Sequence, residues 1–134
     1  MRVVLDTNVL IAAFITRGVC AELLEHCALR HTLVTSPVIL AEFHEHLVGK
    51  FEFTRAEAEE ATRLIESLAE LVVPTAPAEA ICRDGDDDLV IGTAVVGNAE
   101  CIITGDKDLL AVECFQGIAI LSPKDFASFE SLSD

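Results

Sequence analysis

Short apolar runs alternate with longer segments of helical periodicity along the whole chain. The runs have the length and the β-branched content of buried strands. The predicted strands are Val3–Leu5, Thr32–Thr35, Leu71–Val73, Cys101–Thr104 and Ile118–Leu121. The segments between them predict helices at 9–15, 19–29, 38–48, from 54 onward and 89–97, with two short helices near the C-terminus. Strands that alternate with helices predict a three-layer α/β/α sandwich around a parallel sheet of four or five strands.

Polar side chains mark four of the predicted helix starts. They are Thr7–Asn8, Ser36–Pro37, the capping box Thr54–Glu57, and Ser122–Pro123. Serine, threonine and asparagine accept hydrogen bonds from the first free N–H groups of a helix, and proline suits the first helical position. The helix after Thr54 is the clearest amphipathic one, and its inward face is predicted to be Ala61, Leu64, Ile65 and Leu68. Residues 74–86 are predicted to form a loop.

Size and cysteine content indicate one domain in a reducing compartment. We expect the 134 residues to form a single domain, 1–134, that buries its core without disulfides. No apolar run approaches the roughly 18 residues of a membrane span, and no signal peptide precedes the first strand. The five cysteines form no CxxC pair and fall mostly in apolar segments, which predicts buried thiols in the cytoplasm.

The formal charge of −14 restricts the function. With 23 acidic residues against nine lysines and arginines, the surface repels phosphate backbones and argues against a simple nucleic-acid-binding module. The acids either form solvated helix faces or hold divalent cations, which reverse the local field. Such a surface also suits a basic protein partner.

Four of the acids fall where a parallel sheet gathers its functional groups. Asp6 directly follows the first strand, and Asp106 follows the strand that ends at Thr104. The carboxyl ends of parallel strands share one edge of the sheet, and ligands bind there. Asp87 begins the apolar helix that starts on this edge. Glu42 lies beside the apolar stripe of its helix, so it is either at a solvated helix edge or in the same site.

Carboxylates that converge without a counterion raise each other's pKa, and a divalent ion removes that conflict. Oxygen ligands without clustered histidine or cysteine favour Mg²⁺ or Mn²⁺ over Zn²⁺. These ions bind phosphates and activate water for phosphodiester cleavage. His44 and His46 do not share a helix face, so we expect them to be surface residues.

The motifs resemble those of the PIN-domain family, particularly the VapC-type toxins of toxin–antitoxin systems. The resemblance rests on Val3–Leu10, Ser36 with Glu42, Asp87 with Ala94, and Ile103–Asp108, in that order along the chain. It implies a Mg²⁺- or Mn²⁺-dependent endoribonuclease with an α/β/α sandwich fold. It also implies an RNA substrate, an antitoxin partner and a homodimer, with no role for a membrane.

The resemblance assigns roles to individual residues. Asp6, Glu42, Asp87 and Asp106 correspond to the four acidic metal-site residues, and Asn8, Ser36 and Thr104 to the polar residues that support them. Asp87 is chosen as the third acid because it stands seven residues before Ala94, but Asp86 and Asp88 flank it and stay alternatives. Asp108 resembles a trailing acid that caps a turn, and Lys107 is a candidate for contact with substrate.

Three other functions remain to be compared with this one. A non-catalytic PIN-like module that acts through protein partners is disfavoured because all four acids are present. A receiver-type signalling domain expects a phosphoacceptor aspartate after a middle strand, and neither Thr35–Ser36 nor Val73–Pro74 supplies one. A phosphatase of the Asp-x-Asp type requires a second acid where this chain has Asn8.

Overall fold

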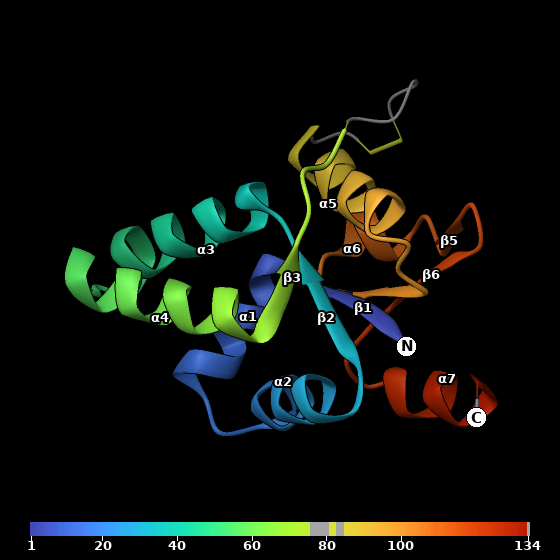
Figure 1. The fold of residues 1–134 in the computed structure, drawn as a ribbon, viewed down its shortest axis with the longest axis horizontal. Coiled ribbons are helices and arrows are strands. Elements are labelled where there is room, and N and C mark those ends of the chain that lie inside the picture. The colour runs from blue at the N-terminus through green and yellow to red at the C-terminus, as the bar shows by residue number, and fades with distance from the viewer. Residues whose placement is uncertain (76–80, 83–84, 134) are drawn as a thin grey trace.

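The computed structural model describes residues 1–75, 81–82 and 85–133, and a mostly parallel sheet lies at its centre (Figure 1). The strands are β1 (Arg2–Leu5), β2 (Thr32–Thr35), β3 (Ala69–Leu71), β4 (Cys101–Ile103), β5 (Cys114–Phe115) and β6 (Ile118–Leu121). They lie in the order β3-β2-β1-β4-β6-β5, and every described pair is parallel except β5 with β6. The predicted α/β sandwich is therefore confirmed.

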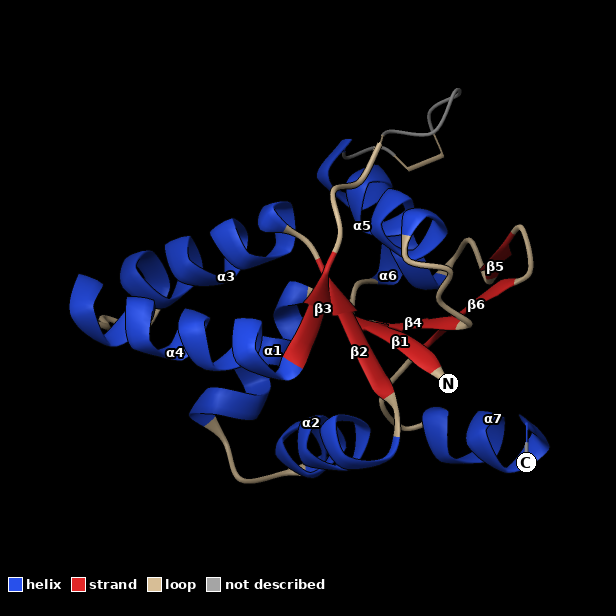
Figure 2. Cartoon of the chain, in the orientation of Figure 1, coloured by secondary structure: helices blue, strands red, loops and turns tan. Residues whose placement is uncertain are grey.

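Helices cover both faces of this sheet (Figure 2). They are α1 (Thr7–Ile15), α2 (Val19–Arg30), α3 (Pro37–Lys50), α4 (Arg55–Leu68), α5 (Gly85–Val96), α6 (Lys107–Leu110) and α7 (Phe126–Ser133). Helix α5 contacts β1, β2 and β4, while α2 contacts β2 and lies beside α7 below the sheet in Figure 1. Within the described residues no single helix has the length and apolar composition to cross a membrane. Helices α1 and α2 would meet both criteria only as a pair, and the chain bends by 109° between them.

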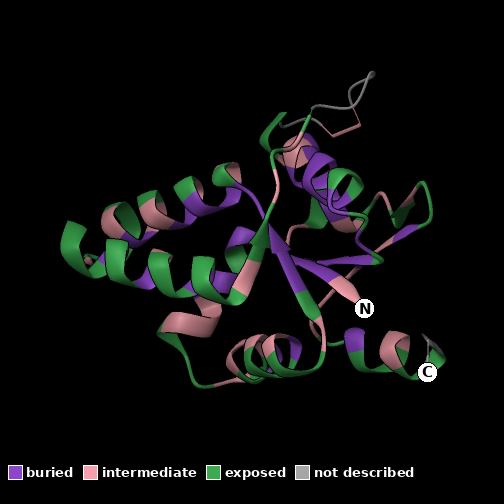
Figure 3. Cartoon of the chain, viewed as in Figure 1, coloured by how far each residue is buried: buried purple, intermediate pink, exposed green. Residues whose placement is uncertain are grey.

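The central strands are buried on both faces, as Figure 3 shows. Val3 and Val4 in β1 and Ile102 and Ile103 in β4 have no exposed surface. A parallel strand between two helical layers needs apolar side chains on both sides, which is why these strands are continuous apolar runs in the sequence. The exposure of the five thiols varies more than predicted. Two cysteines are buried, two are half-buried and Cys114 is exposed, and none forms a disulfide.

Three helix starts differ from the sequence prediction. Helix α1 begins at Thr7 with Asp6 as its N-cap, not with Thr7–Asn8. Helix α5 begins at Gly85 and so takes part of the predicted 74–86 loop, the rest of which lies mostly outside the described residues. The last helix begins at Phe126, because Ser122 accepts the Asp125 N–H in a turn and does not cap the helix.

The sheet also differs from the prediction at both edges. Strand β3 is displaced toward the N-terminus and starts where α4 ends, and Leu64 and Leu68 of α4 are 49% and 40% exposed instead of facing inward. Strand β5 was not predicted. It forms a hairpin with β6 through Gln116 and Gly117, whose φ angles of 50° and 82° are those of a type I′ turn.

Helix α5 needs a glycine where it meets the segment after β3. A Cβ on Gly92 would lie 2.2 Å from the carbonyl oxygen of Thr75. Gly92→Ala is therefore expected to lower the free energy of unfolding by about 1–3 kcal/mol, measured by urea denaturation. Gly49→Ala in α3 is the matched control, because nothing lies within 4 Å of its Cβ position. It should raise stability by roughly 0.5–1 kcal/mol. Equal effects of the two substitutions would contradict the close approach at Gly92.

Candidate metal centre

Strands β1 and β4 bring the first and last acidic motifs together. They are neighbours in the sheet with Leu5 opposite Ile103, so Asp6 and Thr104 emerge side by side at the carboxyl edge. The strand order also reverses at this pair, since the chain passes from β1 to β2 on one side and returns to β4 on the other. Such a reversal point is where open α/β sheets bind their ligands.

Asp6 is a buried carboxylate with three hydrogen-bond donors around it. It is 4% exposed. Its Oδ2 accepts the Thr104 hydroxyl at 2.7 Å and the Asn8 side-chain amide at 3.0 Å, and its Oδ1 accepts the Thr7 N–H at 2.8 Å. Burial nevertheless raises the pKa of Asp6, because loss of solvent outweighs these donors and the charge of Asp106 adds to the shift. The site therefore carries negative charge that its own donors do not fully compensate.

Asn8 connects α1 to the turn after β4. Its amide nitrogen donates to Asp6 while its Oδ1 accepts the Gly105 N–H at 2.9 Å. An aspartate here could accept from Gly105 but could not donate to Asp6, and it would add a further negative charge. The chain thus requires an amide where an Asp-x-Asp phosphatase would have its second acid.

Asp106 is tied to the same network from the β4 side. Its N–H donates to the Thr104 hydroxyl oxygen at 3.0 Å, and Thr104 in turn donates to Asp6. The Asp106 Oδ1 caps α6 by accepting the Asp108 N–H at 2.8 Å. One buried threonine therefore sets the relative positions of both acids.

Glu42 and Asp87 face the same cavity as Asp6 and Asp106. The cavity has a volume of about 460 Å³. Its described lining consists of Asp6, Asn8, Ile11, Ala12, Ile15, Glu42, His46, Lys50, Phe51, Asp87 and Asp106. The four acids predicted from widely separated motifs thus converge on one space, supplied by β1, α3, α5 and the turn after β4.

The three consecutive acids of α5 have different surroundings. Asp88 is buried and accepts the N–H groups of Ile81 and Cys82 at 3.2 and 2.8 Å, so it holds the preceding segment. Asp86 is exposed, and only Asp87 of the three is among the described residues that line the cavity. Carboxylate oxygens of Asp87, Asp106 and Asp108 lie within 4.8 Å of one another. Asp108 is therefore nearer to the acidic group than a turn-capping role predicts.

The sequence model of the PIN domain matches residues 2–108. The chain belongs to the PIN-domain family. No curated protein sequence matches it.

Solved structures share the PIN fold of this chain. VapBC2 from Rickettsia felis, bound to a DNA fragment from its promoter, is 17% identical with a TM-score of 0.65. That alignment covers 90% of this chain and 97% of the other. VapBC-1 from nontypeable Haemophilus influenzae is 19% identical with a TM-score of 0.64 and coverages of 92% and 99%. A protein from Pyrobaculum aerophilum is 16% identical with a TM-score of 0.64 and coverages of 98% and 90%.

Ser36 and Lys107 are further predicted residues that do not line the cavity of this PIN domain. Ser36 is fully buried as the N-cap of α3 and accepts the Thr93 hydroxyl of α5 at 2.9 Å. Ser36 therefore joins the helices that carry Glu42 and Asp87, and it acts on these acids only through the positions of the helices. Lys107 is exposed on α6 and is not among the described cavity residues.

The sequence prediction missed the contribution of the C-terminal part of α3 to the cavity. His46, expected at the surface, lines it together with Lys50 and Phe51. Glu42, His46 and Lys50 are four residues apart and so share one face of α3, rising about 6 Å per step. Once Glu42 was placed in the site, this four-residue spacing could have predicted that His46 and Lys50 lie there as well.

The donor set fits Mg²⁺ or Mn²⁺. Four carboxylates from separate elements surround one cavity, and the pKa of Asp6 is raised partly by the charge of Asp106. A hard divalent cation would remove this repulsion and take carboxylate and water oxygens as ligands. Asp6, Glu42, Asp87 and Asp106 are the residues that could hold it, with Asp108 near enough to contribute.

The hydroxyl of Thr104 should control the protonation of Asp6. Thr104→Val removes the strongest of the hydrogen bonds that oppose the burial effect, so the pKa of Asp6 should rise further. The measurement is a carbon-13 NMR titration of the Asp6 carboxyl group with a chelator present. Because the folded pKa lies above the unfolded one, stability falls as the pH rises through this interval, and the fall should be larger in the variant.

Thr62→Val is the matched control for Thr104→Val. The Thr62 hydroxyl donates to the Ala58 carbonyl within α4, away from the cavity. This variant should leave the Asp6 titration unchanged. A Thr104→Val protein whose Asp6 pKa is unchanged or lower would show that the threonine does not stabilise the carboxylate.

Proposed function

We propose that the protein is a Mg²⁺- or Mn²⁺-dependent endoribonuclease and the toxin of a toxin–antitoxin pair. The observation that carries the proposal is the convergence of Asp6, Glu42, Asp87 and Asp106 on one cavity at the reversal point of the sheet. PIN-domain membership supports a nuclease. The two VapBC structures with the same fold support the toxin assignment.

The residues of the cavity would have separate roles in phosphodiester hydrolysis. The bound cation would supply an activated water and charge stabilisation at the phosphate. Thr104, Asn8 and the Thr7 N–H keep Asp6 in one orientation, so the ligand geometry is set before substrate arrives. Lys50 and His46 lie on the α3 wall and are placed to contact phosphates of the RNA, which offsets the repulsion from a −14 chain.

The surface formed by α4 and β3 is suited to binding a protein partner. Apolar side chains are exposed there at Leu64, Leu68, Leu71 and Val73, the last being 72% exposed. Exposed apolar side chains gathered on one edge are typical of interaction sites. We propose that the protein forms a homodimer and binds an antitoxin, whose basic segment would suit the acidic surface. We place this single-domain protein in the cytoplasm, where its thiols would remain reduced.

Asp6→Asn should abolish RNA cleavage while the fold persists. The substitution removes a ligand charge but keeps an oxygen that can accept the Thr7 N–H. The expected loss is at least about 100-fold, since even indirect partners of a metal site contribute 10–100-fold. The assay is cleavage of single-stranded RNA with Mg²⁺ or Mn²⁺, and circular dichroism checks the fold.

Asp125→Asn is the control, because Asp125 contacts Ser122 in the turn after β6 and is not among the described residues that line the cavity. It should retain full activity. Asp87→Asn and Asp86→Asn form a second pair on one helix, and only the former should lose activity. Full activity of Asp6→Asn would refute the metal-ligand assignment. Mn²⁺ binding without cleavage of any RNA would instead support a non-catalytic PIN module.

A further inference from the structure

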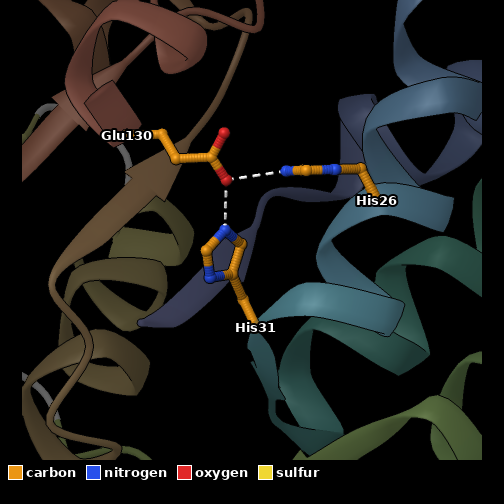
Figure 4. A group of neighbouring side chains, drawn as sticks. All are labelled: His26, His31 and Glu130. Carbon is orange, nitrogen blue, oxygen red and sulfur yellow. Dashed lines mark hydrogen bonds and ion pairs between the residues drawn. The ribbon is translucent and has the colours of Figure 1, made fainter. Parts of the chain in front are cut away.

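Two histidines and a glutamate meet at the opposite edge of the sheet from the acidic cavity. His26 lies on α2, His31 directly precedes β2, and Glu130 lies on α7 (Figure 4). His31 stands at the amino end of β2, whereas Asp6 follows the carboxyl end of β1, its parallel neighbour. The two groups are therefore separated by the length of a strand, and nothing in the proposed nuclease reaction uses the histidines.

The three side chains converge on one point. Oε2 of Glu130 contacts Nε2 of His26 at 2.6 Å and also contacts Nε2 of His31, as the dashed lines in Figure 4 show. One ligand atom from each of the three residues lies within 4.8 Å of the other two. The two imidazole contacts lower the pKa of Glu130, with His26 contributing the larger effect, so the carboxylate is ionised at neutral pH.

Packing holds this arrangement in place. The His31 side chain is 9% exposed, and its ring meets the edge of Phe126, a buried residue of α7, at a centroid distance of 5.8 Å. The two imidazole rings pack edge to face at 5.6 Å. The other ring nitrogen of His31, Nδ1, lies 3.2 Å from the amino nitrogen of Met1. Three ligands from three elements are thus positioned before any ion binds.

We propose that His26, His31 and Glu130 form a Zn²⁺ site that links α2 to α7. Two imidazole nitrogens and one carboxylate are a ligand set that zinc uses in proteins, with a fourth position for water or another side chain. Glu22 lies one turn before His26 on α2, and both line a cavity of about 370 Å³ that Glu130 also lines. Glu22 lies outside the 4.8 Å group, so its side chain would have to turn toward the other three residues to supply the fourth ligand.

The ligand chemistry separates this site from the acidic cavity. Imidazole favours zinc over magnesium, and the cavity has one imidazole, His46, beside its four carboxylates, whereas this cluster has two. Zinc requires the lone pair of each Nε2, so protons compete with the ion for these atoms and affinity should fall at low pH. Two neutral imidazoles, two carboxylates and one Zn²⁺ would give an uncharged cluster.

The test is calorimetric titration of the full chain with Zn²⁺ in excess Mg²⁺, which occupies all-oxygen sites. We expect one zinc ion bound per chain with NMR shifts at the ring nitrogens of His26 and His31, and a zinc-dependent rise in Tm. His26→Ala should weaken binding by at least about tenfold. Because His26 is 44% exposed, this variant should fold.

His44→Ala is the matched control, since His44 lies on α3 outside the cluster, and it should bind zinc like the parent chain. His46→Ala tests for zinc in the acidic cavity, which His46 lines. A smaller than tenfold loss in His26→Ala, or no zinc binding by the parent chain, would overturn the proposal. The contacts would then be a hydrogen-bonded clamp between α2 and α7.

Discussion

The pairing of β1 with β4 is the constraint on which the candidate site depends. It places the Thr104 hydroxyl 2.7 Å from the buried Asp6 carboxylate and beside the Asp106 N–H. The register of the two strands thereby makes neighbours of residues that are almost one hundred positions apart in the sequence. Burial of Asp6 is tolerated because three donors surround it, yet its pKa remains raised. The sheet thus creates an excess of negative charge that a cation can relieve.

The sequence predicted best those features that depend on residues close together in the chain. Asp6 directly follows an apolar strand and Asp106 lies in the turn after another, so pattern alone placed them on one edge of a parallel sheet. Strand β5 was missed because two residues carry no periodic signal, and its turn depends on positive φ angles at Gln116 and Gly117. The nearness of His46 and Asp108 to the acids was not predicted for another reason. Their place beside the acids follows from how α3 and α6 pack, and helical periodicity does not report that packing.

The two edges of the sheet carry different donor chemistry. The carboxyl edge gathers carboxylates on turns and helix starts, where N–H groups can hold them. The amino edge gathers imidazoles at the end of α2 and a carboxylate from α7. A chain of strongly negative net charge can use cations at both edges, and ligand type decides which cation binds where. The same four-residue strands that form the core keep the two sites apart.

The positions of Glu42 and Asp87 in the cavity do not depend on the β1–β4 register. They lie on α3 and α5, and the buried hydrogen bond from Thr93 to Ser36 joins the start of α3 to the C-terminal half of α5. Ser36 also caps α3, so one hydroxyl fixes both the beginning of the helix and its distance from α5. Because His46 and Lys50 share the Glu42 face of α3, the placement of this helix brings their basic side chains beside the acids. Ser36 therefore joins the two helices without lining the cavity.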